Sequence, residues 1–172
     1  VYHDVYDISD GYLQGAYIDF FDVNLKKEKD ENIKLDRFTL LKIKSLAPRD
    51  MFFKPISWGI DLGYEHFKDQ SDYFKIKPET GLTYGNDKDF LYLMIGSNVY
   101  YKNSDQLYSI GSSIGLVTNR FDNIKFGLKY SYDKYNKSLE NNEFEAFTTY
   151  KLDQNASLTL KYINDDLYKE ND

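Results

Sequence analysis

The 172-residue chain contains no cysteine, which excludes disulfides, thiolate zinc sites and cysteine nucleophiles. It has only two histidines, too few for a histidine-rich metal site. The net charge is −6, so the chain lacks the basic surplus that nucleic-acid binding requires. No apolar run approaches the roughly 20 residues of a transmembrane helix. Phosphate-binding loops, metal motifs and nucleophile elbows are also missing. The sequence therefore predicts no enzyme, no catalytic residue, no cofactor, no metal site and no nucleic-acid partner.

Aromatic residues are abundant at 17% of the chain, and tyrosine alone occurs 17 times. This content suits an all-β protein, and it also suits a protein with tyrosines at a membrane boundary. Large apolar residues alternate with small or charged ones over 56–65, 124–132 and 156–162. That period of two is typical of strands with one apolar face and one polar face.

Turn-forming residues separate long alternating segments along most of the chain. The pattern predicts strands at 15–26, 33–45, 56–68, 72–84, 89–102, 107–118, 123–134, 142–152 and 156–166. Segments of this length exceed the average strand of about 5–6 residues and match the about 9–11 that a membrane-spanning strand needs. Short connections predict an antiparallel up-and-down meander, and we expect it to close into an outer-membrane-type β-barrel of about 8–10 strands.

The strand glycines indicate which face points inward. They share a register with the smaller or more polar residues, and glycine relieves crowding inside a narrow barrel. The bulky aliphatic register is then expected to face lipid. The predicted lipid-facing belt comprises Ile56, Trp58, Ile60, Leu62, Phe126, Leu128, Leu158 and Leu160. Tyrosines toward strand ends are expected to form interfacial girdles, namely Tyr64, Tyr84, Tyr101, Tyr108, Tyr132, Tyr150 and Tyr162.

The alternative is a soluble periplasmic barrel with an apolar interior, which binds a lipid or docks a partner domain. The two hypotheses differ in the environment of Trp58, because lipid-attached quenchers reach it only in the first. The charges on the polar register, Lys125 and Lys129 on one strand and Glu143 and Glu145 on another, are expected to pair across strands in the interior.

The first part of the chain contains several distinctive sequence blocks. They are Tyr2-His3-Asp4, Gly11-Tyr12, the segments 15–20 and 35–40, and the block 45–58, which contains Ser-Leu-Ala-Pro-Arg-Asp. These blocks resemble the C-terminal domain of an uncharacterised family of Gram-negative envelope proteins. In that family an Lnb-like (lipoprotein N-acyltransferase-like) periplasmic domain precedes a strand-rich C-terminal domain. The resemblance covers about the first 64 residues, and Ala47 stands where the family pattern has serine. It implies an envelope location and an upstream domain as partner, but no activity for this chain.

Arginine is rare, and two of the three arginines lie next to aspartates. Arginine is preferred where a planar, bidentate contact is needed. The residues assigned to a connecting loop or a domain-docking contact are His3, Asp4, Arg37, Pro48, Arg49 and Asp50. The structural alternative is an Arg49 ion pair that fixes the loop. His3-Asp4 is either a general base with its orienting carboxylate or part of a leader that packs on the barrel mouth, and the pattern favours the leader.

We expect three parts: a leader over 1–14, one barrel domain over 15–168, and a frayed tail over 169–172. Because the chain starts at Val1, we interpret it as a domain of a longer or processed protein. The predicted function is a non-catalytic anchor of a larger envelope protein in the outer membrane of a Gram-negative bacterium. Its partners would be membrane lipid and the upstream periplasmic domain, and its lumen would be mostly plugged.

Overall fold

The computed structural model describes residues 8, 15–26, 34–66, 72–102, 105–121, 123–136, 140–153 and 156–166. Nearly all of these residues lie in strands. The strands are β1 (Ala16–Lys26), β2 (Lys34–Ser45), β3 (Pro48–Arg49), β4 (Ser57–His66), β5 (Asp72–Gly85), β6 (Asp89–Lys102), β7 (Asp105–Phe121), β8 (Ile124–Tyr135), β9 (Glu140–Lys151) and β10 (Ser157–Asp165). Within this part of the chain no helix is long and apolar enough to cross a membrane.

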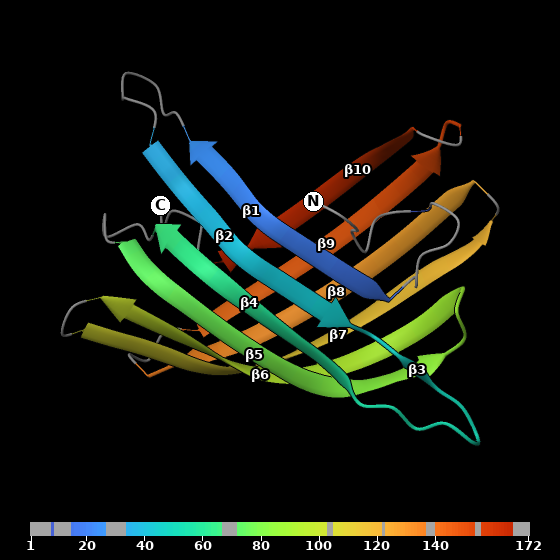
Figure 1. Ribbon diagram of the computed structural model, residues 1–172, viewed down its shortest axis with the longest axis horizontal. Helices are drawn as coiled ribbons and strands as arrows, with labels where there is room; N and C mark the ends of the chain where they lie inside the picture. The colour runs from blue at the N-terminus through green and yellow to red at the C-terminus, as the bar shows by residue number, and fades with distance from the viewer. Residues whose placement is uncertain are drawn as a thin grey trace.

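All ten strands belong to one sheet with the order β1-β2-β4-β5-β6-β7-β8-β9-β10, and the two-residue β3 pairs with β5. Every pair along this path is antiparallel, whereas β3 and β5 are parallel. The predicted all-β, antiparallel up-and-down meander is confirmed. The sheet curls into a half-barrel, in which β1, β2 and β4 cross over β7 to β10 (Figure 1). Over the described residues the path of paired strands begins with β1 and ends with β10.

The long strands form where the alternating pattern predicts them, one for each of the nine ranges. The largest difference is β7, which has 17 residues and extends beyond 107–118 at both ends. Its additional residues pair with β6 at one end and with β8 at the other. The short β3 lies in the long connection between β2 and β4 and was not predicted, because two residues carry no periodic signal.

Two apolar doublets, Phe20-Phe21 on β1 and Leu40-Leu41 on β2, interrupt the alternation near the first edge of the sheet. Thr39 pairs with Gly63 and Leu41 with Leu62, so Leu40 is the extra residue of a β-bulge. Phe21 lies between the residues paired to Thr39 and Leu41, and its φ is 55°. Few non-glycine residues adopt this left-handed backbone. Because of the bulge, the polar residues before each doublet and those after it lie on the same concave face of the sheet.

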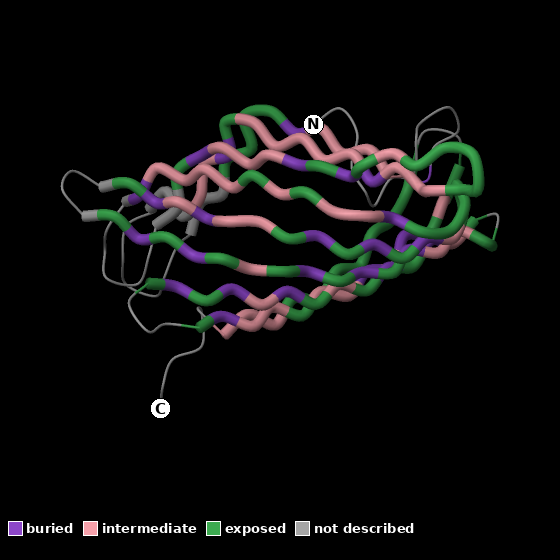
Figure 2. Tube along the Cα trace, turned by 90° about the horizontal axis from the view of Figure 1, so that it is seen from below, coloured by how far each residue is buried: buried purple, intermediate pink, exposed green. Residues whose placement is uncertain are grey.

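Burial alternates along β6, β7 and β8, in the middle of the curled sheet (Figure 2). The buried positions include a large polar set, and most of the exposed positions in the strands are aliphatic or aromatic. The buried polar side chains are Asp19, Thr39, Ser57, Thr83, Asn98, Ser109, Ser113, Lys125, Ser131, Asp133, Asn141 and Thr149. The concave side is thus polar, and the convex side is apolar.

Candidate functional site

The convex face is an apolar surface that runs around the whole half-barrel. Of the eight residues predicted to face lipid, six are exposed, with relative exposures from 38% at Phe126 to 76% at Leu160. Ile60 and Leu62 are half-buried on the same face. Other strands extend the surface with exposed Leu91, Leu93, Ile95, Ile110, Ile114 and Leu116. Contiguous apolar surface of this extent marks contact with a partner or a membrane.

Aromatic side chains form two rows on this face, one near each end of the strands. The row beside the connection from β2 to β4 consists of exposed Trp58, Tyr84, Phe121, Phe126 and Tyr150. The row at the opposite end consists of exposed Tyr64, Tyr101, Tyr108, Phe144 and Tyr162. Six of the seven predicted girdle tyrosines are exposed in these rows, and Tyr132 is half-buried.

The spacing of the two rows can be compared with the thickness of a bilayer. On β5, Tyr84 follows Phe74 by ten positions, and Phe74 packs edge-on against Tyr64 with 5.4 Å between ring centroids. Ten residues of strand span about 34 Å. With the strand tilt of about 40° that is usual in membrane barrels, this corresponds to a height of about 26 Å. The apolar band of outer-membrane barrels is about 25 Å tall, so the two values agree.

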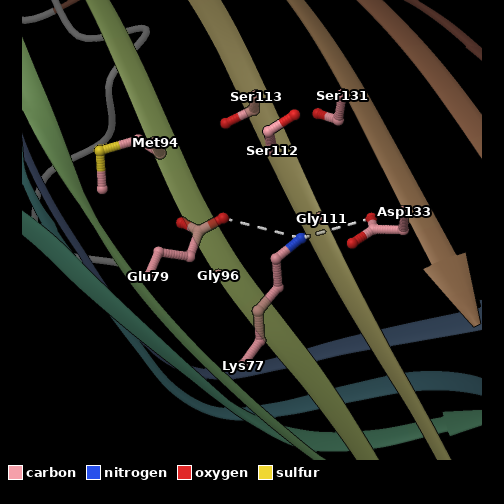
Figure 3. Close-up of a pocket in the computed structure, with 9 residues that line it drawn as sticks. All are labelled: Lys77, Glu79, Met94, Gly96, Gly111, Ser112, Ser113, Ser131 and Asp133. Atoms are coloured by element: carbon pink, nitrogen blue, oxygen red, sulfur yellow. Dashed lines mark ion pairs between the residues drawn. The ribbon is translucent and has the colours of Figure 1, made fainter.

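The concave face holds a network of ion pairs and a hydrogen bond that connects four strands, β2, β5, β6 and β8. Lys77 Nζ lies 3.7 Å from Glu79 Oε1 and 3.9 Å from Asp133 Oδ2 (Figure 3). Glu79 Oε2 also pairs with Lys44 Nζ at 2.8 Å. Asp133 Oδ1 accepts a hydrogen bond of 2.9 Å from Asn98 Nδ2, which links β6 to β8. Paired charges and shared hydrogen bonds offset the desolvation cost of holding these groups inside the sheet.

Three further ion pairs lie on the same face. Lys75 Nζ is 2.9 Å from Asp61 Oδ2, Lys129 Nζ is 2.5 Å from Glu143 Oε1, and Lys161 Nζ is 3.5 Å from Glu145 Oε1. The expectation of cross-strand pairing is confirmed for Glu143 and Lys129. Glu145 pairs instead with Lys161, on the neighbouring edge strand. Lys125 is fully buried beside Thr149, its partner in the β8–β9 register.

Two apolar clusters lie on the concave side, toward opposite ends of the strands. One consists of Leu46, Phe90, Tyr92, Met94, Val117 and Phe147, and the other of Tyr73, Tyr100, Leu107 and Tyr135. Two rings of the first cluster cover glycines directly across the ladder, Tyr92 over Gly115 and Phe147 over Gly127. A Cβ at either glycine would collide with the ring, so these two glycines make room for interior aromatics.

The residues predicted for the loop or docking role do not form one group. Pro48 and Arg49 are half-buried in β3, at the end of the sheet where β2 finishes. Arg37 is half-buried near the opposite end of β2, and it lines an interior cavity. Among the described residues Arg49 forms no ion pair, and its docking role and its structural alternative both stay predictions. His3 and Asp4 lie outside the described residues, and Ile8 is the one described residue of the leader and is buried.

Asp50 organises the tip of this connection. Its Oδ1 accepts hydrogen bonds from the backbone N–H of Phe53 at 2.6 Å and of Phe52 at 2.7 Å. These bonds stabilise the carboxylate, so the pKa of Asp50 lies below its usual value. The turn presents Met51, Phe52 and Phe53 outward as strongly exposed side chains.

Most of the ion pairs on the concave face were not predicted from the sequence. Their signal is nevertheless present in 74–79, where Lys75, Lys77 and Glu79 alternate with Phe74, Ile76 and Pro78. The described residues contain no group of three or more histidine, aspartate or glutamate side chains that could hold a metal ion.

The chain belongs to the family described as "Domain of unknown function (DUF7840)", which matches residues 1–172. No curated protein and no solved structure matches the chain.

Proposed function

We propose that this domain is a membrane anchor of outer-membrane type that holds a larger bacterial envelope protein at the lipid bilayer. The observation that carries the proposal is the inverted polarity of the sheet. Asp19, Lys125 and Asp133 are buried on the concave side, whereas Ile95, Leu158 and Leu160 are exposed on the convex side. Exposure of these apolar side chains to water would be unfavourable, whereas in a bilayer their contact with lipid drives insertion.

The interior supports this proposal over a soluble barrel. In a soluble periplasmic barrel the apolar register would form the core, and the polar register would face water. Here the lysines and carboxylates pair with one another on the concave side, which is how polar lumens of membrane barrels are built. The two aromatic rows also have the spacing of membrane interfaces.

An anchor of this kind works by position rather than chemistry. The aliphatic side chains enter the hydrocarbon, and the aromatic rows fix the depth. The paired strands satisfy the backbone polar groups that lipid cannot. The interior clusters and ion pairs fill much of the lumen, so free diffusion of solutes through the domain is not expected. No catalytic role is assigned to the domain.

The envelope location and an Lnb-like upstream domain complete the proposal, and both rest on the sequence blocks of the first 64 residues. In that arrangement the upstream domain is held at the periplasmic face by the barrel. Arg49 and Asp50 lie on the connection between β2 and β4, where such a domain could be contacted.

Membrane fractionation tests the proposal directly. The parent protein is expressed in a Gram-negative host, the membranes are separated, and unboiled and boiled samples are compared on a gel. We expect outer-membrane fractionation and a band that shifts with heating. Recovery in the soluble periplasmic fraction would refute the anchor and favour the soluble barrel that binds a lipid or a partner domain.

A further inference from the structure

A cavity of about 380 Å³ lies on the concave side between the two edges of the sheet. Tyr17, Asp19 and Asp22 of β1 line it from one edge, and Lys161 of β10 lines it from the other. Its volume falls in the range of about 300–1,000 Å³ that is usual for small-molecule sites. Neither the proposed anchoring role nor the ion-pair network requires a cavity here.

One wall of the cavity is apolar. It is formed by Leu46, Tyr92, Val117 and Phe147, which belong to the buried cluster near the β2–β4 connection. These side chains come from four separate elements and are fixed by packing. They offer a preformed surface on which a hydrocarbon chain can lie.

The rest of the lining includes four lysines, and three of them form an ion pair with a carboxylate. Lys44 pairs with Glu79, Lys129 with Glu143, and Lys161 with Glu145. Lys42 is the exception within the described residues. Its Nζ lies 4.9 Å from the centre of the Tyr17 ring and forms no ion pair there. The Asp61 carboxylate, its partner in the β2–β4 register, attracts the Lys42 ammonium group but forms its direct ion pair with Lys75, so Lys42 can still donate hydrogen bonds to an anionic ligand.

Asp19 supplies the second unused group. It is 5% exposed and lies directly opposite Lys42 in the β1–β2 register. Its Oδ2 accepts a hydrogen bond of 3.2 Å from the Tyr17 hydroxyl, but its Oδ1 has no hydrogen-bond partner. A buried carboxylate oxygen without a partner is costly, so this atom favours a ligand that donates a hydrogen bond.

From this arrangement we infer that the cavity binds a single-chain amphiphile whose anionic head group carries a hydroxyl. The anionic group accepts hydrogen bonds from Lys42, the hydroxyl donates to Asp19 Oδ1, and the chain lies against the wall of Leu46, Val117 and Phe147. A lysophospholipid with a glycerol phosphate head has this chemistry. The inference concerns the concave side and goes beyond the anchoring role.

The experiment measures binding of lysophosphatidylglycerol to the full chain by titration calorimetry. The protein is held in phosphatidylcholine nanodiscs if it fractionates with membranes, and in buffer if it does not, so failure of the anchor leaves this test intact. Glycerol phosphate tests the head group alone, and lysophosphatidylcholine tests a chain whose head group carries no net negative charge. We expect saturable binding of the first probe and much weaker binding of the other two.

The variants assign the binding to the cavity. Lys42→Gln should weaken binding roughly ten- to hundredfold, because a hydrogen bond to a charged group is lost. Lys42→Arg should retain most of the affinity, and Asp19→Asn should weaken it less than Lys42→Gln. The control is Lys134→Gln, which removes the same charge from an exposed position on β8 that does not line this cavity, and it should bind as the unmodified chain does.

Three results would overturn the inference. The first is no saturable binding of lysophosphatidylglycerol. The second is equal binding of glycerol phosphate, which would indicate a free-anion site without a chain. The third is equal weakening by Lys42→Gln and Lys134→Gln when both variants keep the heat-shifted band or the far-ultraviolet spectrum of the unmodified chain.

Discussion

The substitution Ile95→Arg examines the environment of the convex face at its centre. Ile95 is 58% exposed on β6, and its neighbours across the ladders are Thr80 and Ser112. It lies near the middle of the strand, between Tyr101 in one aromatic row and Leu91, which pairs with Tyr84 in the other row. Because the Ile95 side chain is more than half exposed, a longer side chain can extend away from the sheet.

The expected cost depends entirely on the surrounding medium. Arginine on the lipid face of a membrane barrel costs about 2–4 kcal/mol at the midplane and about 0–1 kcal/mol near the interfaces. An exposed substitution in water usually stays within about 0.5 kcal/mol. Leu91→Arg is the matched control, because it places the same side chain on the same strand and face beside Tyr84.

The assay is equilibrium unfolding in urea of the full chain refolded into phosphatidylcholine vesicles, followed by the fluorescence of Trp58. Ile95→Arg should lower the free energy of unfolding by about 2–4 kcal/mol, and Leu91→Arg by no more than about 1 kcal/mol. Equal and small losses at both positions would refute the assignment of the convex face to lipid.

Three further predictions concern the interior and the connection between β2 and β4. Gly127→Ala should lower the free energy of unfolding by about 1–3 kcal/mol, measured by urea unfolding, because the added Cβ meets the Phe147 ring. An unchanged midpoint would contradict this packing. Glu79→Gln should lower the free energy of unfolding by about 3 kcal/mol in the same assay, because it leaves Lys44 without its carboxylate inside the sheet. An unchanged free energy of unfolding would mean that these charges are solvated. The pKa of Asp50 is lowered by backbone hydrogen bonds, so the turn that follows it should be ordered above about pH 4 and should loosen as the pH falls through the lower folded value. The amide resonances of that turn should titrate with a midpoint below the model-peptide value of about 3.9, and Asp50→Asn should abolish this titration.

The fold was predictable because the hydrophobic pattern has a period of two over nearly the whole chain. Each alternating segment produced one long strand, and short polar turns made sequential strands neighbours. The β-bulge was not predicted, because Phe20-Phe21 and Leu40-Leu41 read only as apolar doublets. Whether such a doublet forms a bulge depends on the partner strand. On β4, Gly63 pairs with Thr39 and Leu62 with Leu41, which leaves Leu40 as the extra residue.

The polarity of the two faces could be predicted from the glycines, but the interior partners could not. Alternation places Glu145 and Lys129 on the same side of the sheet. The β8–β9 register places Lys129 directly opposite Glu145, but the ion pairs run diagonally, from Lys129 to Glu143 and from Glu145 to Lys161, so the register alone does not identify the partners. The cavity beside Lys42 depends on the curl of the whole sheet, because β1 and β10 are 130 or more residues apart in sequence. No local pattern carries that information.

The most direct test of the account is the depth of Trp58, the one tryptophan of the chain. Brominated phosphatidylcholines that carry bromine either near the head group or near the end of the acyl chain are compared as quenchers in vesicles. Trp58 lies in an aromatic row, so the shallow bromine should quench it more strongly. In the double variant Trp58→Phe with Ile95→Trp, the deep bromine should be the stronger quencher. Absence of quenching by either lipid at both positions would show that the convex face does not contact the bilayer and would contradict the account.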